Sequence, residues 1–416
     1  MNHHLKKASI ISIGNEVLSG RTVDTNAAYI ARQLRTVGVP VVSSYTVPDE
    51  EAAIQRALQL AGQDADVVIT TGGLGPTDDD LTRQAFAAYL GVDLVLQEDL
   101  LARLREFFER RGRAMAEKNT IQACLPTGAT AIENEMGTAP GLMVEREGRL
   151  LLALPGVPRE MRHMLDTVVV SRLRAMASGQ SVVVRRLRCY GAGESNIAEM
   201  LGQAMRRGRN PLVNCTASAG IITLEIVATG PDRGQAEEMA SAEEAALREI
   251  LGSLVYGTGD QSLAEVVGQR LTQSGRTLAV AESCTGGLLA KLITDVPGAS
   301  RYFAGGWIAY SNEIKNRELG VPQELLDAHG AVSEPVAAAM AQGARRKAGA
   351  DLAVAITGIA GPAGGSEQKP VGLVYIAVSG QEGTDTPKYV FPQDRSSVRL
   401  RAAQTALDTL RLRLEV

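Results

Sequence analysis

Cysteine and histidine are both scarce in this chain of 416 residues. The four cysteines are widely separated and form no Cys-x-x-Cys pair, so we expect neither a disulfide framework nor a zinc site, and a reducing cytoplasm is favoured. The histidines, which all lie outside the polar segments described below, are His3, His4, His163 and His329. A catalytic Ser-His triad is therefore not expected.

Excess charge and long apolar runs are also absent. The net charge of −4 and the pI near 5.8 argue against an electrostatic nucleic-acid binder. The apolar run Ala8–Ile13 is too short for a signal sequence or a membrane span. Hydrophobic residues at 45% and charged residues at 22% are typical of a soluble globular enzyme, and the length predicts about three domains.

The N-terminal part of the chain alternates strand and helix patterns. Strands are predicted at Ala8–Ile13, Val39–Val47 and Asp66–Thr70, with helices between them over Ala27–Val37 and around Ile54–Ala61. This βαβαβ order predicts a three-layer α/β domain with a parallel sheet. Ligands are expected outside the carboxyl ends of its strands.

Two further domains are predicted after a composition change at Met164. Ser178-Gly179-Gln180 is typical of a linker, and the strand and helix patterns from Ser181 to Leu251 indicate a small α+β domain. The remaining chain returns to α/β alternation. The predicted domains are therefore residues 1–170, 171–252 and 253–416.

The segment Ala281–Gly287 lies between a buried-strand pattern, Thr277–Val280, and a helical pattern that starts at Leu288. A serine at such a turn, Ser283, is lifted out of the sheet beside backbone N–H groups of the helix start, which suit an oxyanion. The simpler alternative is that Ser283 only caps the helix. Cys284 is a second candidate nucleophile, although packing into the core is the favoured interpretation for it.

Other polar residues follow strands in the same domain. They lie in the segments Tyr310–Lys315 and Thr357–Pro362 and at Arg395 and Arg399. With no histidine nearby, Lys315 is the best candidate base for the serine. It would need a pKa lowered by burial or by a neighbouring cation such as Arg399. A lysine on a polar helix face is otherwise simply solvated.

A glycine-rich turn, Thr71–Thr77, runs directly into Asp78-Asp79-Asp80 in the N-terminal domain. Backbone N–H groups of such a turn can approach phosphate closely, and adjacent carboxylates suit a Mg²⁺-type cation. Aspartates also favour helix N-termini for purely structural reasons. The pattern is neither a Walker A loop nor a Rossmann fingerprint.

The C-terminal motifs AESCTGG, YSNEIK and TGIAGP, with the Arg395–Arg399 segment, resemble the C-terminal domain of the CinA family, which is similar to nicotinamide-mononucleotide (NMN) deamidase. The resemblance implies hydrolysis of the NMN carboxamide to a carboxylate with release of ammonia, without a cofactor. It implies Ser283 as nucleophile, Lys315 as base, Tyr310 and Thr357 as supporting groups, Gly298 and Ala360 as nucleotide-site residues and Arg399 as phosphate ligand.

The N-terminal motifs also resemble this family, whose first domain is similar to molybdopterin-binding proteins. They include Gly14-Asn15-Glu16, Asp24-Thr25-Asn26, the Gly72–Asp80 loop, Asn134–Gly141 and Pro155–Glu160. The resemblance implies a pyrophosphatase that cleaves ADP-ribose to AMP and ribose 5-phosphate with a divalent metal. Substrate positions would be Asn15, Glu16, Asn26, Gly72 and Gly73, and metal positions Asp24, Asp79 and Asp80. Pterin or nucleotide binding without catalysis is the alternative.

The middle domain resembles the family's KH-type fold, but Gly191-Ala192-Gly193-Glu194 lacks the Gly-x-x-Gly clamp of RNA-binding KH modules. We therefore expect the middle domain to be a spacer or a dimerisation element. For the whole protein we expect a homodimer that binds small nucleotides (NMN and ADP-ribose) and neither nucleic acid nor a membrane. A DNA-uptake or repair accessory protein is a further alternative, against which the net acidity and the missing clamp argue.

Overall fold

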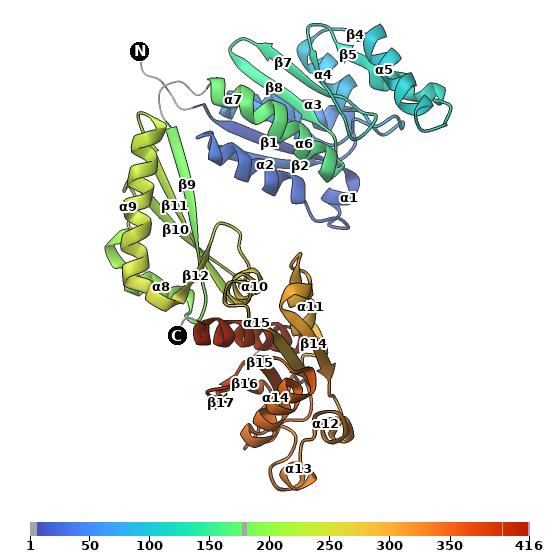
Figure 1. Ribbon diagram of the computed structural model, residues 1–416. Coiled ribbons are helices and arrows are strands. Elements are labelled where there is room, and N and C mark those ends of the chain that lie inside the picture. The colour runs from blue at the N-terminus through green and yellow to red at the C-terminus, as the bar shows by residue number, and fades with distance from the viewer. Residues whose placement is uncertain (1–5, 177–180, 393, 415–416) are drawn as a thin grey trace. The chain divides into compact units, whose positions relative to one another are not determined.

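The computed structural model describes residues 6–176, 181–392 and 394–414. The chain divides into two compact units, Met1–Val184 with Ala228–Met239 and Arg185–Val227 with Ala240–Val416. Helices and strands alternate through most of both units, so the predicted α/β class is confirmed (Figure 1). The linker predicted at residues 178–180 lies outside the described residues.

The first unit is built on a sheet of order β2-β1-β3-β8-β7-β6. Its strands are β1 (Ala8–Ile13), β2 (Val41–Val47), β3 (Val67–Thr71), β6 (Thr130–Ile132), β7 (Gly141–Arg146) and β8 (Arg149–Leu154). The pairs β1–β2, β1–β3 and β3–β8 are parallel, as predicted. The pairs β7–β8 and β6–β7 add an antiparallel edge that the periodicity did not reveal.

Helices cover both faces of this sheet, giving three layers (Figure 1). The first face carries α2 (Thr25–Thr36), α6 (Pro158–Met164) and α7 (Val170–Met176), and the second carries α3 (Glu51–Asp64) and α4 (Thr82–Leu90). Side chains alternate along a strand, so Ile10 packs in the first core and Ile11 in the second.

A separate excursion leaves the sheet between β3 and β6. It contains β4 (Leu94–Leu96), α5 (Glu98–Glu109), a 3₁₀ segment (Glu117–Ala123) and β5 (Cys124–Pro126), which pairs with β4. The sequence did not predict this subdomain.

The middle segment forms a four-stranded sheet of order β10-β11-β9-β12. Its elements are β9 (Ser181–Cys189), α8 (Glu194–Leu201), β10 (Leu212–Ser218), β11 (Ile221–Gly230), α9 (Arg233–Leu251) and β12 (Val255–Thr258). The predicted α+β character is confirmed, although β10 and β12 were not predicted.

Among all the helices that the structure describes, none has the length and the apolar composition that a membrane span needs.

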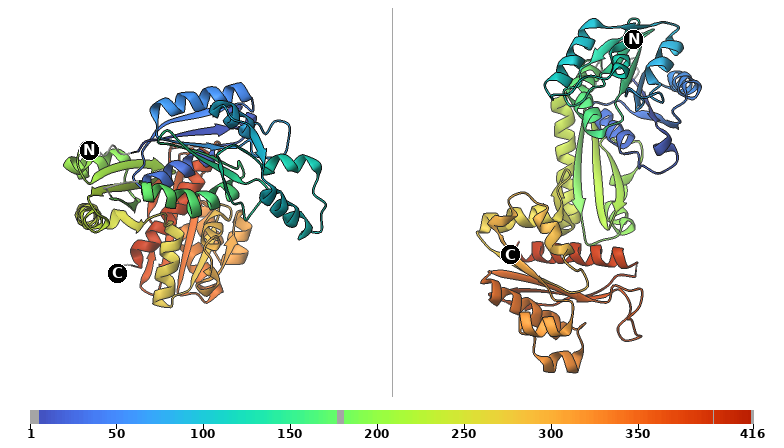
Figure 2. Two further views of the ribbon diagram at one scale, coloured as in Figure 1. Left: turned by 90° about the horizontal axis from the view of Figure 1, so that it is seen from above. Right: turned by 90° about the vertical axis from the view of Figure 1, so that its right-hand side faces the viewer.

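The C-terminal sheet has the order β14-β13-β15-β16-β17, with β18 also paired to β16. Its strands are β13 (Leu278–Glu282), β14 (Phe303–Ile308), β15 (Leu352–Gly358), β16 (Leu373–Gly380), β17 (Gly383–Asp385) and β18 (Lys388–Val390). Its helices are α10 (Leu263–Ser274), α11 (Leu288–Thr294), α12 (Asn312–Leu319), α13 (Gln323–His329), α14 (Glu334–Ala348) and α15 (Arg395–Arg413). The sheet lies between α15, red in Figure 2, and the orange helices of the other face.

Alternation along β13 assigns its residues to these two faces. Leu278 and Val280 pack with α10, α11 and α15, whereas Ala279 and Ala281 pack with α14. Strand β13 lies between β14 and β15 and is parallel to both. The chain therefore reverses its direction of winding at β13, and the carboxyl ends of these three strands form the crevice in which open α/β sheets bind ligands.

Candidate active site

Ser283 and Lys315 meet at the carboxyl end of the C-terminal sheet. Ser283 follows β13 directly, and its backbone N–H donates to Ile356 O of β15 at 2.9 Å. Lys315 lies on α12, and its Nζ is 3.2 Å from Ser283 Oγ. The structure therefore brings together a hydroxyl and an amine that are separated by 32 positions in the sequence.

Lys315 is buried, with only 1% of its surface exposed. Its ammonium group donates to the carbonyl oxygens of Ala309 at 2.9 Å and Tyr310 at 3.0 Å. Burial lowers the Lys315 pKa from 10.5 to about 8, so an uncharged amine is available near neutral pH. The cation effect that the sequence suggested for Arg399 is not among the causes of this shift.

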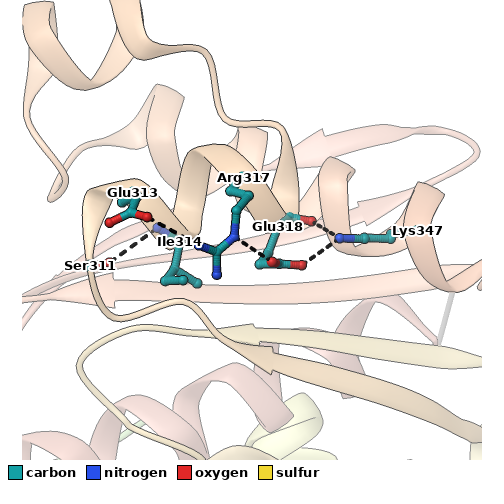
Figure 3. Close-up of polar contacts among 6 residues, drawn as sticks. All are labelled: Ser311, Glu313, Ile314, Arg317, Glu318 and Lys347. Atoms are coloured by element: carbon teal, nitrogen blue, oxygen red, sulfur yellow. Dashed lines mark hydrogen bonds and ion pairs between the residues drawn. The ribbon is translucent and has the colours of Figure 1, made fainter.

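Helix α12 is fixed at both ends, which sets the direction of Lys315. Ser311 caps it by accepting from Ile314 N at 3.2 Å. Arg317 contacts Glu313 and Glu318, and Lys347 of α14 contacts Glu318 at 2.8 Å (Figure 3). These exposed or partly exposed ion pairs contribute little stability each. The two made by Arg317 lie within α12, and the Lys347–Glu318 pair ties α12 to α14.

Glu282 occupies the start of the helix beside the serine. Its buried carboxylate accepts from the backbone N–H groups of Gly287, Leu289 and Ala290 at 2.8–3.0 Å. The N–H groups expected to hold an oxyanion are thus partly taken by a side chain. In this described turn, the N–H groups of Cys284 and Thr285 donate to no oxygen acceptor and remain suited to that role.

Arg399 holds the same turn from α15. Its Nη2 and Nε donate to Thr285 O at 2.7 and 3.3 Å. The Thr285 hydroxyl is buried and has no hydrogen-bond partner among the described residues. A buried hydroxyl without a partner is costly and needs an explanation, which a bound substrate or water would supply.

An open hollow of about 660 Å³ adjoins this turn. Ala360, Pro362 and Val371 give it an apolar side, and Arg395 and Arg399 give it two cations. Ala360, predicted as a nucleotide-site residue, and Arg399, predicted as the phosphate ligand, therefore line one hollow.

Among the described residues, neither Tyr310 nor Thr357 forms a hydrogen bond with Ser283, although the Tyr310 carbonyl accepts from Lys315 Nζ. The Tyr310 side chain is 61% exposed, and its hydroxyl accepts from Arg395 Nη2 at 3.4 Å. Thr357, at the end of β15, donates to Ala331 O at 2.8 Å. Their contribution in this structure is to position backbone and Arg395.

No hydrogen bond joins Gly298 to Ser283 among the described residues, and its place in the nucleotide site stays a prediction. It lies in the turn after α11, whereas Ser283 precedes that helix. Cys284 is buried, and burial raises the pKa of its thiol to about 11. The thiol is therefore protonated near neutral pH, which disfavours it as the nucleophile.

A second crevice lies in the N-terminal unit, where the winding direction reverses at β1. Gly14 follows β1, and Gly72 and Gly73 follow the neighbouring β3. Gly72 has φ of 111°, and a Cβ there would lie 2.1 Å from Ile13 O, so only glycine fits. The two predicted glycines thus allow backbone to approach closely at the ligand edge of the sheet.

Asn26 lies beside Gly72. Its Nδ2 donates to Thr71 Oγ1 at 3.0 Å and Gly156 O at 2.8 Å. Its Oδ1 is buried without a partner among the described residues, and so is available for a donor on a ligand. The sequence predicted Asn26 as a substrate residue, and the structure places it in the crevice.

Asp80 and Arg83 organise the glycine-rich turn. Asp80 accepts from Gly75 N at 2.8 Å and from Thr77 N at 2.9 Å. Arg83 is fully buried and donates to Leu74 O and Gly75 O, and burial lowers its pKa to about 10. No pattern in the sequence indicated a role for this arginine.

The three predicted metal ligands, Asp24, Asp79 and Asp80, are not gathered around one point among the described residues. Both oxygens of Asp24 are engaged, one by Ala27 N and one by the Ser12 hydroxyl. Asp79 is exposed and Asp80 is committed to the turn. Throughout residues 6–176, 181–392 and 394–414, no group of three His, Cys, Asp or Glu side chains is placed to hold a metal.

Asp49 is an acidic residue of this crevice that sequence reasoning missed. It accepts from Asn15 N at 2.8 Å. Burial raises its pKa, and the charges of Glu16, Asp79 and Asp80 raise it further. These four carboxylates thus share one region, and Asn15 and Glu16 lie within it.

Three family models match successive parts of the chain. They are described as "Probable molybdopterin binding domain" for residues 9–175, "Damage-inducible protein CinA KH domain" for 184–257 and "CinA C-terminal domain" for 260–414.

Curated relatives match over nearly the whole length. A CinA-like protein of Dictyoglomus thermophilum is 41% identical over 405 residues, covering 97% of this chain and 98% of the relative. A CinA-like protein of Gemmatimonas aurantiaca is 44% identical over 408 residues, covering 97% of this chain and 95% of the relative. A crystal structure of the protein CinA from Thermoplasma acidophilum, of unknown function, is 40% identical and covers 40% of this chain and 98% of that one, with a TM-score of 0.38. The chain belongs to the CinA family.

Proposed function

We propose that the C-terminal site is an amidohydrolase that converts NMN to nicotinate mononucleotide and ammonia. The observation that carries this proposal is the 3.2 Å contact between Ser283 Oγ and the buried Lys315 amine, whose pKa is about 8. A hydroxyl becomes nucleophilic when a positioned base removes its proton, and this amine is such a base.

The reaction proceeds in two halves. The uncharged Lys315 amine takes the Ser283 proton, and the oxygen forms a bond to the carboxamide carbon. The backbone N–H groups of Cys284 and Thr285 stabilise the resulting oxyanion. The C–N bond then breaks as Lys315 returns the proton to nitrogen, and ammonia leaves an acylated Ser283. Water, deprotonated by Lys315, cleaves this ester, and the proton returns to Ser283.

Two features support a phosphorylated, ring-bearing substrate. The hollow beside the Thr285 turn combines the guanidinium groups of Arg395 and Arg399 with the apolar side chains of Ala360 and Val371. Arginine is suited to phosphate and apolar side chains to a pyridine ring. Arg399 also contacts Thr285 O, which links phosphate binding to the turn that carries the nucleophile.

The test is ammonia release from NMN by the purified full chain. Wild-type protein should release ammonia and form nicotinate mononucleotide in equal amounts, and Ser283→Ala should form neither. Cys284→Ala is the matched control, because it alters the neighbouring side chain and leaves the proposed nucleophile. Activity that survives in Ser283→Ala would end this proposal.

We propose a second function for the N-terminal crevice, which is binding and cleavage of ADP-ribose to AMP and ribose 5-phosphate. The supporting observation is the unpartnered Asn26 Oδ1 beside Gly72, at the crevice where the winding reverses. Because the predicted carboxylates do not fit a resident metal centre, we derive no step through a metal. An AMP assay with and without chelator tests activity and metal dependence together, and binding without AMP formation would favour the non-catalytic alternative.

A further inference from the structure

A groove of about 610 Å³ separates α5 from the loop of residues 133–140 in the N-terminal unit. Leu100, Leu104, Phe107 and Pro140 contribute apolar surface to it. Arginines of the α5 region and glutamates of the loop line it as well. None of these residues belongs to the sites assigned above.

The Arg111 guanidinium lies over one face of the Phe107 ring in this groove. The Arg111 guanidinium carbon lies 3.6 Å from the centroid of the Phe107 ring. Arg103 pairs with Glu133 and Arg110 with Glu106, whereas Arg111 has no carboxylate partner among the residues described. Nucleic-acid bases stack on such aromatic and guanidinium planes.

One hydrogen bond and one close backbone approach connect the groove to the crevice at Gly72. Asn134 of the groove donates to Glu160 Oε2 at 2.6 Å, and Glu160 belongs to α6. Gly156, just before α6, is so close to Gly72 that a Cβ on it would lie 3.3 Å from Gly72 Cα. The groove wall and the glycine turn are therefore parts of one edge of the sheet.

The distance along this edge suits an extended ligand. Three strand spacings separate β3, which carries the Gly72 turn, from β6, which precedes the 133–140 loop. At about 4.8 Å per spacing, this is roughly 14 Å. A nucleoside diphosphate sugar can extend over such a distance with its phosphates at one end and its base at the other.

We propose that this groove binds the purine base of a nucleoside diphosphate whose phosphates lie at the Gly72 turn. The inference rests on the N-terminal function proposed above and specifies the ligand class of that site. Arg111, supported from behind by the Phe107 ring, stacks against the base. A carboxylate oxygen of Glu133 or Glu135, which pair with Arg103 and His163, accepts from the exocyclic amino group of the base.

The experiment compares a ligand with a base and one without. Binding of ADP-ribose and of inorganic pyrophosphate is measured by calorimetry on the full chain. Phe107→Ala should weaken ADP-ribose binding at least about fivefold and leave pyrophosphate binding unchanged. Phe108→Ala is the matched control, since Phe108 stacks edge-on against Phe107 at 6.0 Å but does not line the groove. It should leave both affinities unchanged.

A second pair of variants keeps the proposal testable if Phe107→Ala fails to fold. Arg111→Ala should weaken ADP-ribose binding by roughly two- to fivefold, while Arg113→Ala, an exposed arginine outside the groove, should have no effect. If wild-type protein binds ADP-ribose and both groove variants bind it equally well, the groove assignment is wrong and the N-terminal function stands. If wild-type protein binds neither ligand, both are wrong.

Discussion

The pH dependence of NMN deamidation tests whether the Lys315 amine is the base that deprotonates Ser283. Only the uncharged Lys315 amine can take the serine proton, and its pKa is about 8. The uncharged fraction is then about 9% at pH 7, about 50% at pH 8 and about 91% at pH 9. The value of kcat/KM should therefore rise about tenfold from pH 7 to pH 9 and level off above that.

The assay is ammonia release at NMN concentrations well below KM, since kcat/KM reports the ionisation of the free enzyme. The NMN phosphate, with a second pKa of about 6, is already a dianion above pH 7 and adds little to the slope. Lys315→Met should lower kcat/KM by about 10²- to 10⁴-fold, the usual contribution of a general base, and abolish the rise with pH.

Two outcomes would refute this reasoning. One is a flat wild-type profile between pH 7 and 9. The other is an unchanged tenfold rise in Lys315→Met, which would assign the titration to another group. Circular dichroism of the variant at each pH distinguishes loss of the base from loss of the fold.

Three further predictions concern stability and the neighbouring residues. Because the folded-state Lys315 pKa of about 8 lies below 10.5, the folded state binds fewer protons between these values, so the stability of wild type relative to Lys315→Met should rise with pH across this window. The rise should be at most about 3 kcal/mol in urea denaturation, and a constant difference would contradict the pKa shift. Cys284→Ala should keep most NMN turnover, because the thiol pKa is about 11, and loss of turnover with the fold intact would point to the thiol. Gly72→Ala should destabilise the N-terminal unit by roughly 1–3 kcal/mol or more, whereas Gly91→Ala, where a Cβ meets nothing within 4 Å, should cost less; equal thermal shifts would contradict the close approach.

Much of the C-terminal site was predictable because the carboxyl ends of parallel strands lie at one edge of the sheet. Ser283, Tyr310 and Thr357 each follow an apolar strand pattern, and the crossover rule places such ends on one edge. The choice of Lys315 as base followed from the absence of histidine. The burial of Lys315 was not predictable, since Ile314 and Leu319 are the only large apolar residues of α12. The ion pair that ties α12 to α14, Lys347–Glu318, is long-range in sequence.

The role of Glu282 was available from the sequence but overlooked. In β13 it has the same parity as Leu278 and Val280, which face α11, so its carboxylate is directed to the start of that helix. In the N-terminal unit, the sequence Asp78-Asp79-Asp80 does not indicate which aspartate stabilises the turn and which could bind a ligand. That distinction depends on Gly75 and Thr77, whose backbone N–H groups donate to Asp80. The buried Arg83 holds the same turn by donating to Leu74 O and Gly75 O.

The central claim is that NMN is hydrolysed through an acyl ester on Ser283. Transfer of the acyl group to hydroxylamine tests this claim most directly. If NMN is hydrolysed through an ester on Ser283, hydroxylamine will compete with water and yield the hydroxamate of the nucleotide while ammonia release continues, and Ser283→Ala will give neither product. Wild-type ammonia release with only the carboxylate product at every hydroxylamine concentration would contradict the covalent mechanism.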